Sequence, residues 1–420
     1  MISVVVIGII VLMFVFDLAV TLVNYQHRKQ PISPIVQDIY DQEKYAKWLN
    51  YSMETTRFEI IVNAISTILI LCLLVFGVFG ILERWTNGWF QNDILRTLSF
   101  LGVYFIFSSL INLPFAYYET FVIEEKYGFN KSTPKTFFID QLKSLLVSAI
   151  LFGVLLGVLN VLYLTFIDRL WLFILTAWGI LSAVIVVINI LNTKVFIRIF
   201  NKLTPLPDGT LKKRIESLAA KVGFNVTAIS IMDASRRSTK LNGFFSGIGK
   251  TREVVLFDTL LDRMTEDEII AVLAHELGHA VHKDIPRQLI RQIFLFGVYA
   301  ALIGWILQSA EFSQAFGVSG PNFGFSLILF SILISPISLL IGIPLNALSR
   351  KAESAADAFS AQYADQKSIF SALRTLAQEN LADLNPHPFY VLMHYTHPPL
   401  ADRLQAIKQL TERQTSRVSN

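Results

Sequence analysis

The chain of 420 residues is 53% hydrophobic and only 16% charged, whereas an ordinary soluble domain has about 25% charged residues. This deficit excludes a soluble enzyme of ordinary composition and favours a protein that crosses a membrane several times. The formal net charge of +4 predicts no nucleic-acid partner, and a single cysteine, Cys72, excludes a disulfide or a cysteine metal site within one chain.

Seven apolar runs are long enough to cross the core of a bilayer, which takes about 20 residues per helix. The runs are residues 1–23, 58–82, 96–117, 138–163, 170–195, 288–309 and 323–345. The first run lacks a basic start and a small-residue cleavage site, so we expect a retained helix rather than a signal peptide.

The distribution of Lys and Arg predicts the orientation in the membrane. The connections 24–57, 118–137 and 196–287 and the C-terminal tail carry many basic residues, and the connections on the other side carry few. Basic loops stay in the cytoplasm. We therefore predict an outward-facing N-terminus and a cytoplasmic active site, in either a bacterial inner membrane or an endoplasmic reticulum.

The spans and loops divide the chain into four segments. Residues 1–195 hold transmembrane helices 1–5 with their cytoplasmic loops, and residues 288–345 hold helices 6 and 7. Residues 196–287 and 346–420 are the only pieces large enough for a soluble domain. Neither is long enough to bury a good core alone, so we expect them to assemble together.

A helix over 265–283 carries the clearest chemical signal. Thr265 and Glu268 form a capping box ahead of an apolar-periodic run. His275 and His279 are four residues apart, so both imidazoles project from one helix face. That spacing suits one zinc ion, with Glu276 beside the open position as a general base.

Two alternatives to a metal site are a chance match and a pair of histidines on a solvated helix. The neighbours of these histidines are apolar and small, which predicts a buried helix. Buried imidazoles and a carboxylate without partners are costly. A metal ion supplies the missing partner, so we favour zinc.

The third ligand is expected from "RKAESAADAF", residues 350–359, which continues the last apolar run as a helix. Glu353 and Asp357 share one face of that helix. We expect Glu353 to bind zinc and Asp357 to accept a hydrogen bond from a ligand imidazole. The alternative is a solvated acidic stripe.

The sequence resembles the integral-membrane zinc metalloproteases that include the type-I CAAX prenyl proteases. The likeness runs from about residue 24 to 408. Related quality-control proteases are shorter, and the length and "VIEEKYGFN" favour the seven-helix CAAX branch. The matching stretches are "ETFVIEEKYGFN" (119–130), "DASRRSTKLNGFFSG" (233–247), "VVLFDTLLDRMTEDEIIAVLAHELGHAVHKD" (254–284), "RKAESAADAFS" (350–360) and "HYTHPPLADRL" (394–404).

The resemblance implies that His275, His279 and Glu353 bind one zinc ion per chain. It also implies that Glu276 is the catalytic base and that Asp357 lies behind a ligand histidine. The fold implied is an all-α membrane protein. Seven transmembrane helices enclose a chamber, and a mostly helical cytoplasmic metalloprotease domain lies at its end.

Three further site residues follow from the same resemblance. Asn242 would contact the substrate backbone near the scissile bond, and His397 would stabilise the oxyanion. Arg403 would lie near a carboxylate of the site. The Pro-Pro pair after His397 restricts the chain there, so the imidazole could be held rigidly.

The function predicted is a membrane-embedded zinc endopeptidase that cuts near the C-terminus of membrane-bound peptides, with or without a prenyl group. One alternative is a quality-control protease for membrane proteins. Another is a transporter or a non-catalytic scaffold. A transporter would show paired broken helices in two matching halves, which the sequence lacks, and a dead scaffold would lack a ligand or the base.

Overall fold

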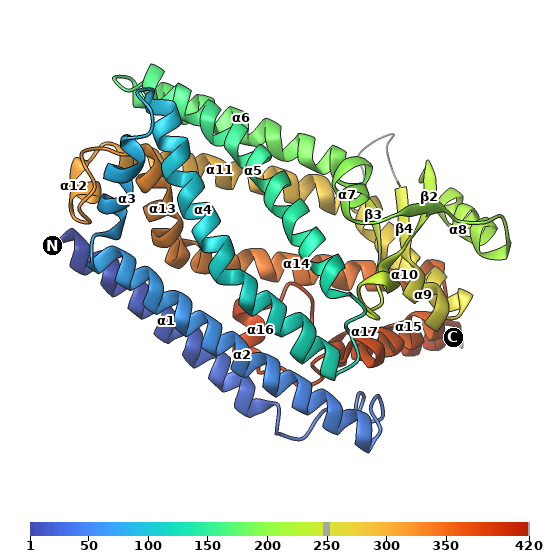
Figure 1. Cartoon of the computed structure of the whole chain (residues 1–420). Helices are drawn as coiled ribbons and strands as arrows, with labels where there is room; N and C mark the ends of the chain where they lie inside the picture. The colour runs from blue at the N-terminus through green and yellow to red at the C-terminus, as the bar shows by residue number, and fades with distance from the viewer. Residues whose placement is uncertain (247–252, 419–420) are drawn as a thin grey trace.

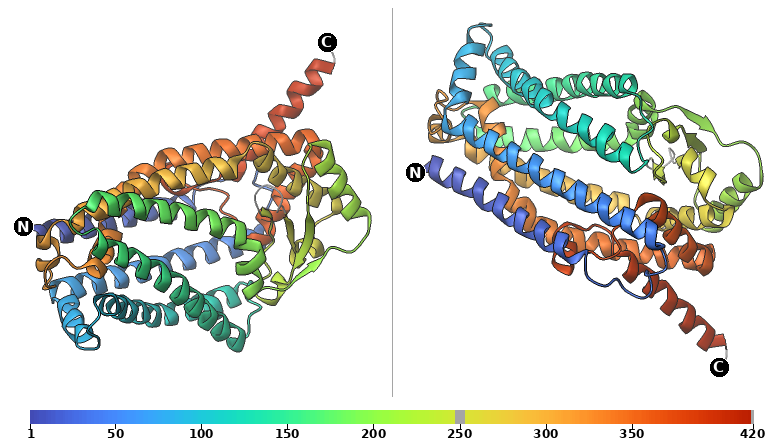
Figure 2. Two further views of the ribbon diagram at one scale, coloured as in Figure 1. Left: turned by 90° about the horizontal axis from the view of Figure 1, so that it is seen from above. Right: turned by 60° about the horizontal axis from the view of Figure 1, so that its bottom comes forward.

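A bundle of long helices and a smaller part make up the molecule, as seen in a computed structural model that describes residues 1–246 and 253–418 (Figure 1). The smaller part comes from segments 196–287 and 346–420, for which the sequence analysis predicts a peptidase, and is called the peptidase part. The helices form an elongated bundle, and a sheet with shorter helices lies at one end of it. The last helix projects away from the rest of the peptidase part (Figure 2).

Six helices of the described chain are long and apolar enough to cross a membrane, or up to seven spans if one bent pair counts as a span. The bent pair is α13 (Phe323–Leu333) and α14 (Ser335–Tyr363), which meet at 49°. The predicted membrane protein is confirmed, and an enclosed chamber stays a prediction. The other long helices are α1 (Ile2–His27), α2 (Gln42–Val75), α4 (Asp93–Tyr118), α5 (Pro134–Thr165), α6 (Leu170–Leu191) and α11 (Asp284–Leu307).

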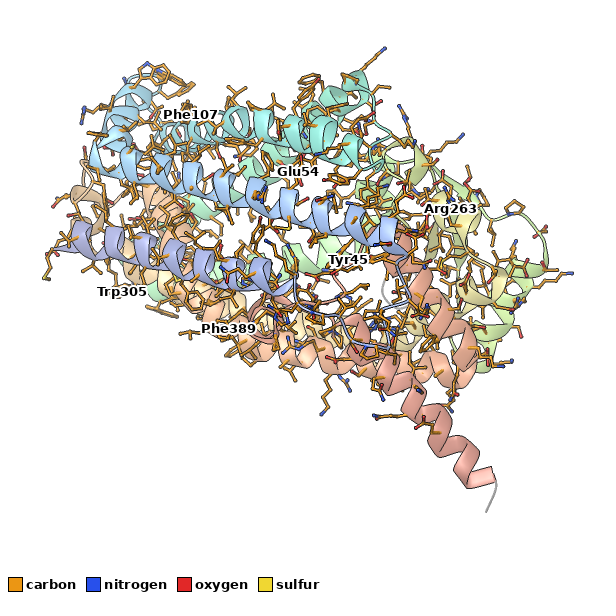
Figure 3. All side chains as sticks on the ribbon, turned by 90° about the horizontal axis from the view of Figure 1, so that it is seen from below. Tyr45, Glu54, Phe107, Arg263, Trp305 and Phe389 are labelled. Carbon is orange, nitrogen blue, oxygen red and sulfur yellow. The ribbon has the colours of Figure 1, made fainter. Side chains whose placement is uncertain are left out.

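The two ends of the bundle differ in what they carry. The N-terminus and the short helices α3 (Val78–Asn87) and α12 (Ala310–Gln314) lie at one end (Figure 1). Trp305 marks this end and Arg263 marks the peptidase end in Figure 3. Both large non-membrane segments therefore meet at the end opposite the N-terminus.

A four-stranded sheet forms one wall of the peptidase part, in the order β1-β2-β4-β3. β2 and β4 are parallel, and the outer pairs are antiparallel. The sequence analysis did not predict these strands; the predicted mostly helical fold is confirmed, with this sheet added to it. The strands are β1 (Leu203–Pro205), β2 (Ala228–Met232), β3 (Gly243–Ser246) and β4 (Glu253–Phe257).

Helix α10 (Glu266–Val281) lies at the centre of the peptidase part. The predicted capping box between Thr265 and Glu268 is confirmed, with both reciprocal bonds present. The helix packs against the sheet and against several other helices. The shorter helices here are α7 (Arg198–Phe200), α8 (Thr210–Lys221), α9 (Asp258–Arg263), α15 (Gln366–Asn380), α16 (Pro388–His394) and α17 (Leu400–Val418).

α10 and α14 approach closely because small residues line their contact. A Cβ added to Gly278 would lie 3.1 Å from the Cα of Ala356 and 3.1 Å from the Cβ of Phe359. The hydroxyl of Ser360 on α14 donates to the carbonyl of Ala271 on α10 over 2.7 Å. This contact brings the two helices that carry the predicted ligands together.

Candidate active site

The three predicted metal ligands meet in the gap between α10 and α14. The Nε2 atoms of His275 and His279 are 3.2 Å apart. The Nε2 of His275 lies 3.3 Å from Oε2 of Glu353, and the Nε2 of His279 lies 3.3 Å from Oε1 of the same carboxylate. Ligand atoms about 2.0–2.1 Å from a tetrahedral zinc ion stand roughly 3.3 Å from each other. The two imidazoles and the carboxylate are therefore close enough together to hold one metal ion.

Two carboxylates set the tautomers of the ligand histidines. The Nδ1 of His275 is 2.9 Å from Asp357 Oδ1, and the Nδ1 of His279 is 3.0 Å from Asp284 Oδ2. Asp284 accepts the hydrogen bond from Nδ1 of His279, while Asp357 is close to Nδ1 of His275 without the geometry of a hydrogen bond. Each carboxylate favours a proton on the nearer Nδ1 and leaves Nε2 with a lone pair towards the site. Two facing lone pairs repel each other unless a cation lies between them.

The charges around His275 also favour a cation. Burial opposes a charge on this imidazole, yet Asp357 and Glu353 raise its pKa to about 9. The Oε2 atom of Glu353 is buried, and no hydrogen-bond donor reaches it among the described residues. A metal ion would supply the positive charge that these groups favour, so the residues fit the metal.

Asp284 is a site residue that the sequence analysis missed. It begins α11, immediately after a turn in which Lys283 adopts a positive φ of 59°. That turn brings the carboxylate back to His279, five residues earlier in the chain. The signal was available as the last letter of "HELGHAVHKD", but nothing in the spacing indicates where the chain turns after a helix.

Arg403 and Asp357 form a two-bond ion pair behind His275. The guanidinium donates to both carboxylate oxygens of Asp357 over 2.8 and 2.6 Å. The same guanidinium lies 4.0 Å from Glu353. Such a bidentate pair fixes orientation as well as charge. Arg403 therefore holds Asp357 in place beside the imidazole of His275, and its role in the reaction stays a prediction.

Glu276 lies on α10 between the two ligand histidines and is half-buried. Burial raises the pKa of its carboxyl group above the usual range. A raised pKa suits a group that takes up a proton during a reaction. Its carboxylate also accepts a hydrogen bond from the backbone of Phe245 in β3, so the base and this strand lie together.

His397 reaches the site from the loop between α16 and α17. Its Nε2 lies 3.2 Å from Glu353 Oε1, while 60% of the side chain is exposed. Its Nδ1 is 3.0 Å from the hydroxyl of Thr396. Arg350 of α14 donates to the carbonyl of Tyr395 over 2.6 Å and so anchors the loop. A substrate can therefore reach an imidazole whose loop is fixed.

Asn242 directly precedes β3, which is the outer strand of the sheet beside α10. Its side chain is exposed, and its Oδ1 accepts a bond from the N–H of Gly243. Asn380, at the end of α15, holds both backbone groups of Leu241 over 2.8 and 3.1 Å. The sequence analysis missed Asn380, because only the fold brings it to this strand.

Two families match the chain in succession. Residues 21–202 match the CAAX prenyl protease N-terminal family, described as five membrane helices, and residues 205–411 match peptidase family M48. A CAAX prenyl protease 1 homolog from Oryza sativa is 33% identical over 95% of both chains. The chain belongs to the CAAX prenyl protease family.

Other relatives agree across almost the whole chain. CAAX prenyl protease 1 of Saccharomyces cerevisiae is 32% identical over 97% of this chain and 95% of the relative. The crystal structure of S. mikatae Ste24p matches with a TM-score of 0.92 and 30% identity, over 97% of this chain and 99% of that one. Membership of this family confirms the predicted membrane metalloprotease and its metal ion. The kind of ion and the role of each residue stay predictions.

Proposed function

We propose that this chain is a zinc endopeptidase that cleaves CAAX-type peptides near their C-terminus while they are bound to the membrane. The observation that carries the proposal is the donor set of His275, His279 and Glu353, spaced at 3.2–3.3 Å. Glu276 and the exposed His397 flank this set. Two imidazoles and one carboxylate are a ligand set typical of catalytic zinc.

Zinc bound there would act as a Lewis acid towards water and the scissile carbonyl. Glu276 takes the proton of the attacking water and passes it to the leaving amine. Asp357 and Asp284 keep the two imidazoles in the tautomer that leaves Nε2 unprotonated. The imidazole of His397 donates a hydrogen bond to the carbonyl oxygen as negative charge develops on it.

The substrate backbone is proposed to bind along the free edge of β3. An outer strand has unpaired N–H and C=O groups, and an extended peptide can pair with them. Asn242 stands at the start of this edge, and Glu276 lies against Phe245 within it. A peptide bound there has its backbone next to the base and the metal ligands.

The substrate class is proposed from the names of the relatives, and a pair of peptides tests it. Purified protein in lipid vesicles receives a peptide with a farnesylated cysteine near its C-terminus, or the same peptide without the farnesyl group. Cleavage is measured by mass spectrometry, with preference for the farnesylated peptide expected. Equal cleavage of both peptides would remove the prenyl group from the recognised features and favour a quality-control protease.

His397→Ala should lower kcat by about 10²-fold and change KM little, because a donor that acts on the oxyanion strengthens only in the transition state. The measurement is steady-state kinetics with the cleaved peptide. A raised KM with unchanged kcat would instead make His397 a residue that binds the ground-state substrate.

The active site is proposed to face the cytoplasm, because the loops on its side hold most of the Lys and Arg. Cysteines placed at Ser319 and at Glu412, in a Cys72→Ser background, should react with an impermeant maleimide from opposite faces of oriented vesicles. Glu412 should react from the cytoplasmic face. Labelling of both cysteines from one face would refute the prediction that a single span separates residues 319 and 412.

A further inference from the structure

A loop from the membrane part runs beside the chain that leads to Asn242. This loop, residues 127–131, begins in the "VIEEKYGFN" stretch (122–130), to which the proposed function gives no role. Its backbone pairs with residues 237–239 like a short strand. The backbone bonds are Lys131 N–H to Arg237 O at 3.0 Å and Thr239 N–H to Phe129 O at 3.1 Å, and a bridge joins Asn130 and Ser238.

The sequence explains why the loop turns back at this point. Helix α4 ends in a π-helical turn, η1 (Glu119–Glu124), a feature that often occurs at functional sites. Gly128 then adopts a φ of +81°, which is unstrained only for glycine. The N–H of Phe129 donates back to the carbonyl of Glu124 over 2.8 Å. The chain is thereby reversed to run along residues 237–240.

Glu124 and Lys240 tie the two segments together through their side chains. Lys240 Nζ lies 3.1 Å from Glu124 Oε2, and the hydroxyl of Tyr51 donates to Glu124 Oε1 over 2.6 Å. The same ammonium group stands 4.7 Å from the ring centre of Phe129. The ammonium group of Lys240 therefore joins α2, η1 and the loop to the peptidase part.

Lys240 stands two residues before Asn242. The residue between them, Leu241, is held by the amide of Asn380 on its other side. The chain entering β3 is thus fixed from the membrane part at Lys240 and from α15 at Leu241.

We propose that Glu124 and Lys240 are positioning residues, through which the membrane helices set the edge strand β3 at the right distance from Glu276 for a peptide to bind. This inference rests on the proposed function, because it takes β3 as the strand that binds substrate. The pair does not touch the reacting atoms and acts through Asn242 and β3.

The pair contributes little to the stability of the fold. The side chains of Lys240 and Glu124 are 40% and 20% exposed, and ion pairs near the surface are worth about 0–1 kcal/mol. The same segment has a second anchor, Arg237, which binds Asp140 of α5 with two bonds of 2.8 and 3.2 Å and does not depend on Glu124 or Lys240. Loss of the Glu124–Lys240 pair therefore leaves a folded protein in which substrate binding can be measured.

The test uses the full chain in lipid vesicles with Glu124→Gln, Lys240→Met and the charge exchange Glu124→Lys with Lys240→Glu. Each single variant should raise KM about tenfold and leave kcat within about twofold, the pattern of a lost binding contact. The charge exchange should return KM to within about threefold of the parent. Metal content should not change in any variant.

Asp38→Asn is the matched control. It breaks the Asp38–Arg374 pair of 2.9 Å, which also joins the N-terminal part to the peptidase part but involves neither residues 124–131 nor residues 237–240. KM should not change in this variant. A second readout, hydrogen exchange of residues 237–245, needs no turnover. Exchange should be faster in Glu124→Gln and unchanged in α10.

Single variants with the KM of the parent, or a charge exchange no better than the singles, would overturn the inference. So would unchanged hydrogen exchange over 237–245 in Glu124→Gln. If the parent chain cleaves no peptide, the proposed function fails by itself, and the exchange measurement still decides whether the pair sets the position of β3.

Discussion

Glu276→Gln should lower kcat by about 10²- to 10⁴-fold and leave the bound metal in place, because only proton transfer is removed. Glutamine has the shape of glutamate, so the packing of α10 between the sheet and α14 is kept. The carboxylate is half-buried, and burial raises its pKa. The measurement is peptide turnover together with the metal content of the purified protein.

A matched control for this variant is Asp402→Asn, which also neutralises one carboxylate but at an exposed position on α17. It should have the turnover and metal content of the parent. Turnover of Glu276→Gln within tenfold of the parent would show that another group takes the proton. Loss of the metal would show that Glu276 helps to hold the ion.

Glu353→Ala should abolish turnover for a different reason, because the ion itself is lost. The two remaining donors, His275 and His279, come from a single helix, and a site with three protein ligands rarely survives as one with two. Metal content measured by elemental analysis should fall from one ion per chain to near zero. Added metal should no longer raise Tm, because the native state would lose the ligand that stabilises it.

Ser354→Ala is the control on the same helix. Ser354 is exposed and follows Glu353 directly, and its hydroxyl donates only to the carbonyl of Arg350. This variant should keep one metal ion per chain. Full metal occupancy in Glu353→Ala would remove Glu353 from the ligand set. Its contacts with His275 and His279 would then have no role in binding the ion.

Local sequence signals were enough to predict the helix that carries the two histidines and the cap at its start. The capping box at Thr265 and the spacing of His275 and His279 depend only on helix geometry, so a short stretch is enough to recognise them. Glu353 required one further step, the expectation that its helix continues a membrane span. The positions of Asp284 and Asn380 depend on a turn after a helix and on tertiary packing. A sequence pattern shows neither the turn nor the packing.

The membrane helices show a similar limit of prediction from sequence. An apolar run indicates burial in lipid but does not show where a helix breaks. The run 58–82 is divided at Gly77, whose φ is +61°, and the run 323–345 is divided before Ser335. The strands β2 and β4 are only five residues long. Apolar runs so short do not distinguish a strand from a buried piece of helix.

Helix α14 runs without a break from the last apolar run to Glu353. It therefore sets the distance between the bilayer and the predicted metal site. Glu353 follows residue 345, the end of the last apolar run, by eight residues of unbroken helix. At 1.5 Å per residue this is a rise of about 12 Å. An extended peptide spans about 3.4 Å per residue, so about four residues cover the same height. With residue 345 at the bilayer surface and α14 upright, a lipid anchor that stays in the bilayer is about four residues from a bond held at the metal ligands, and a nearer anchor is drawn out of the lipid along the protein.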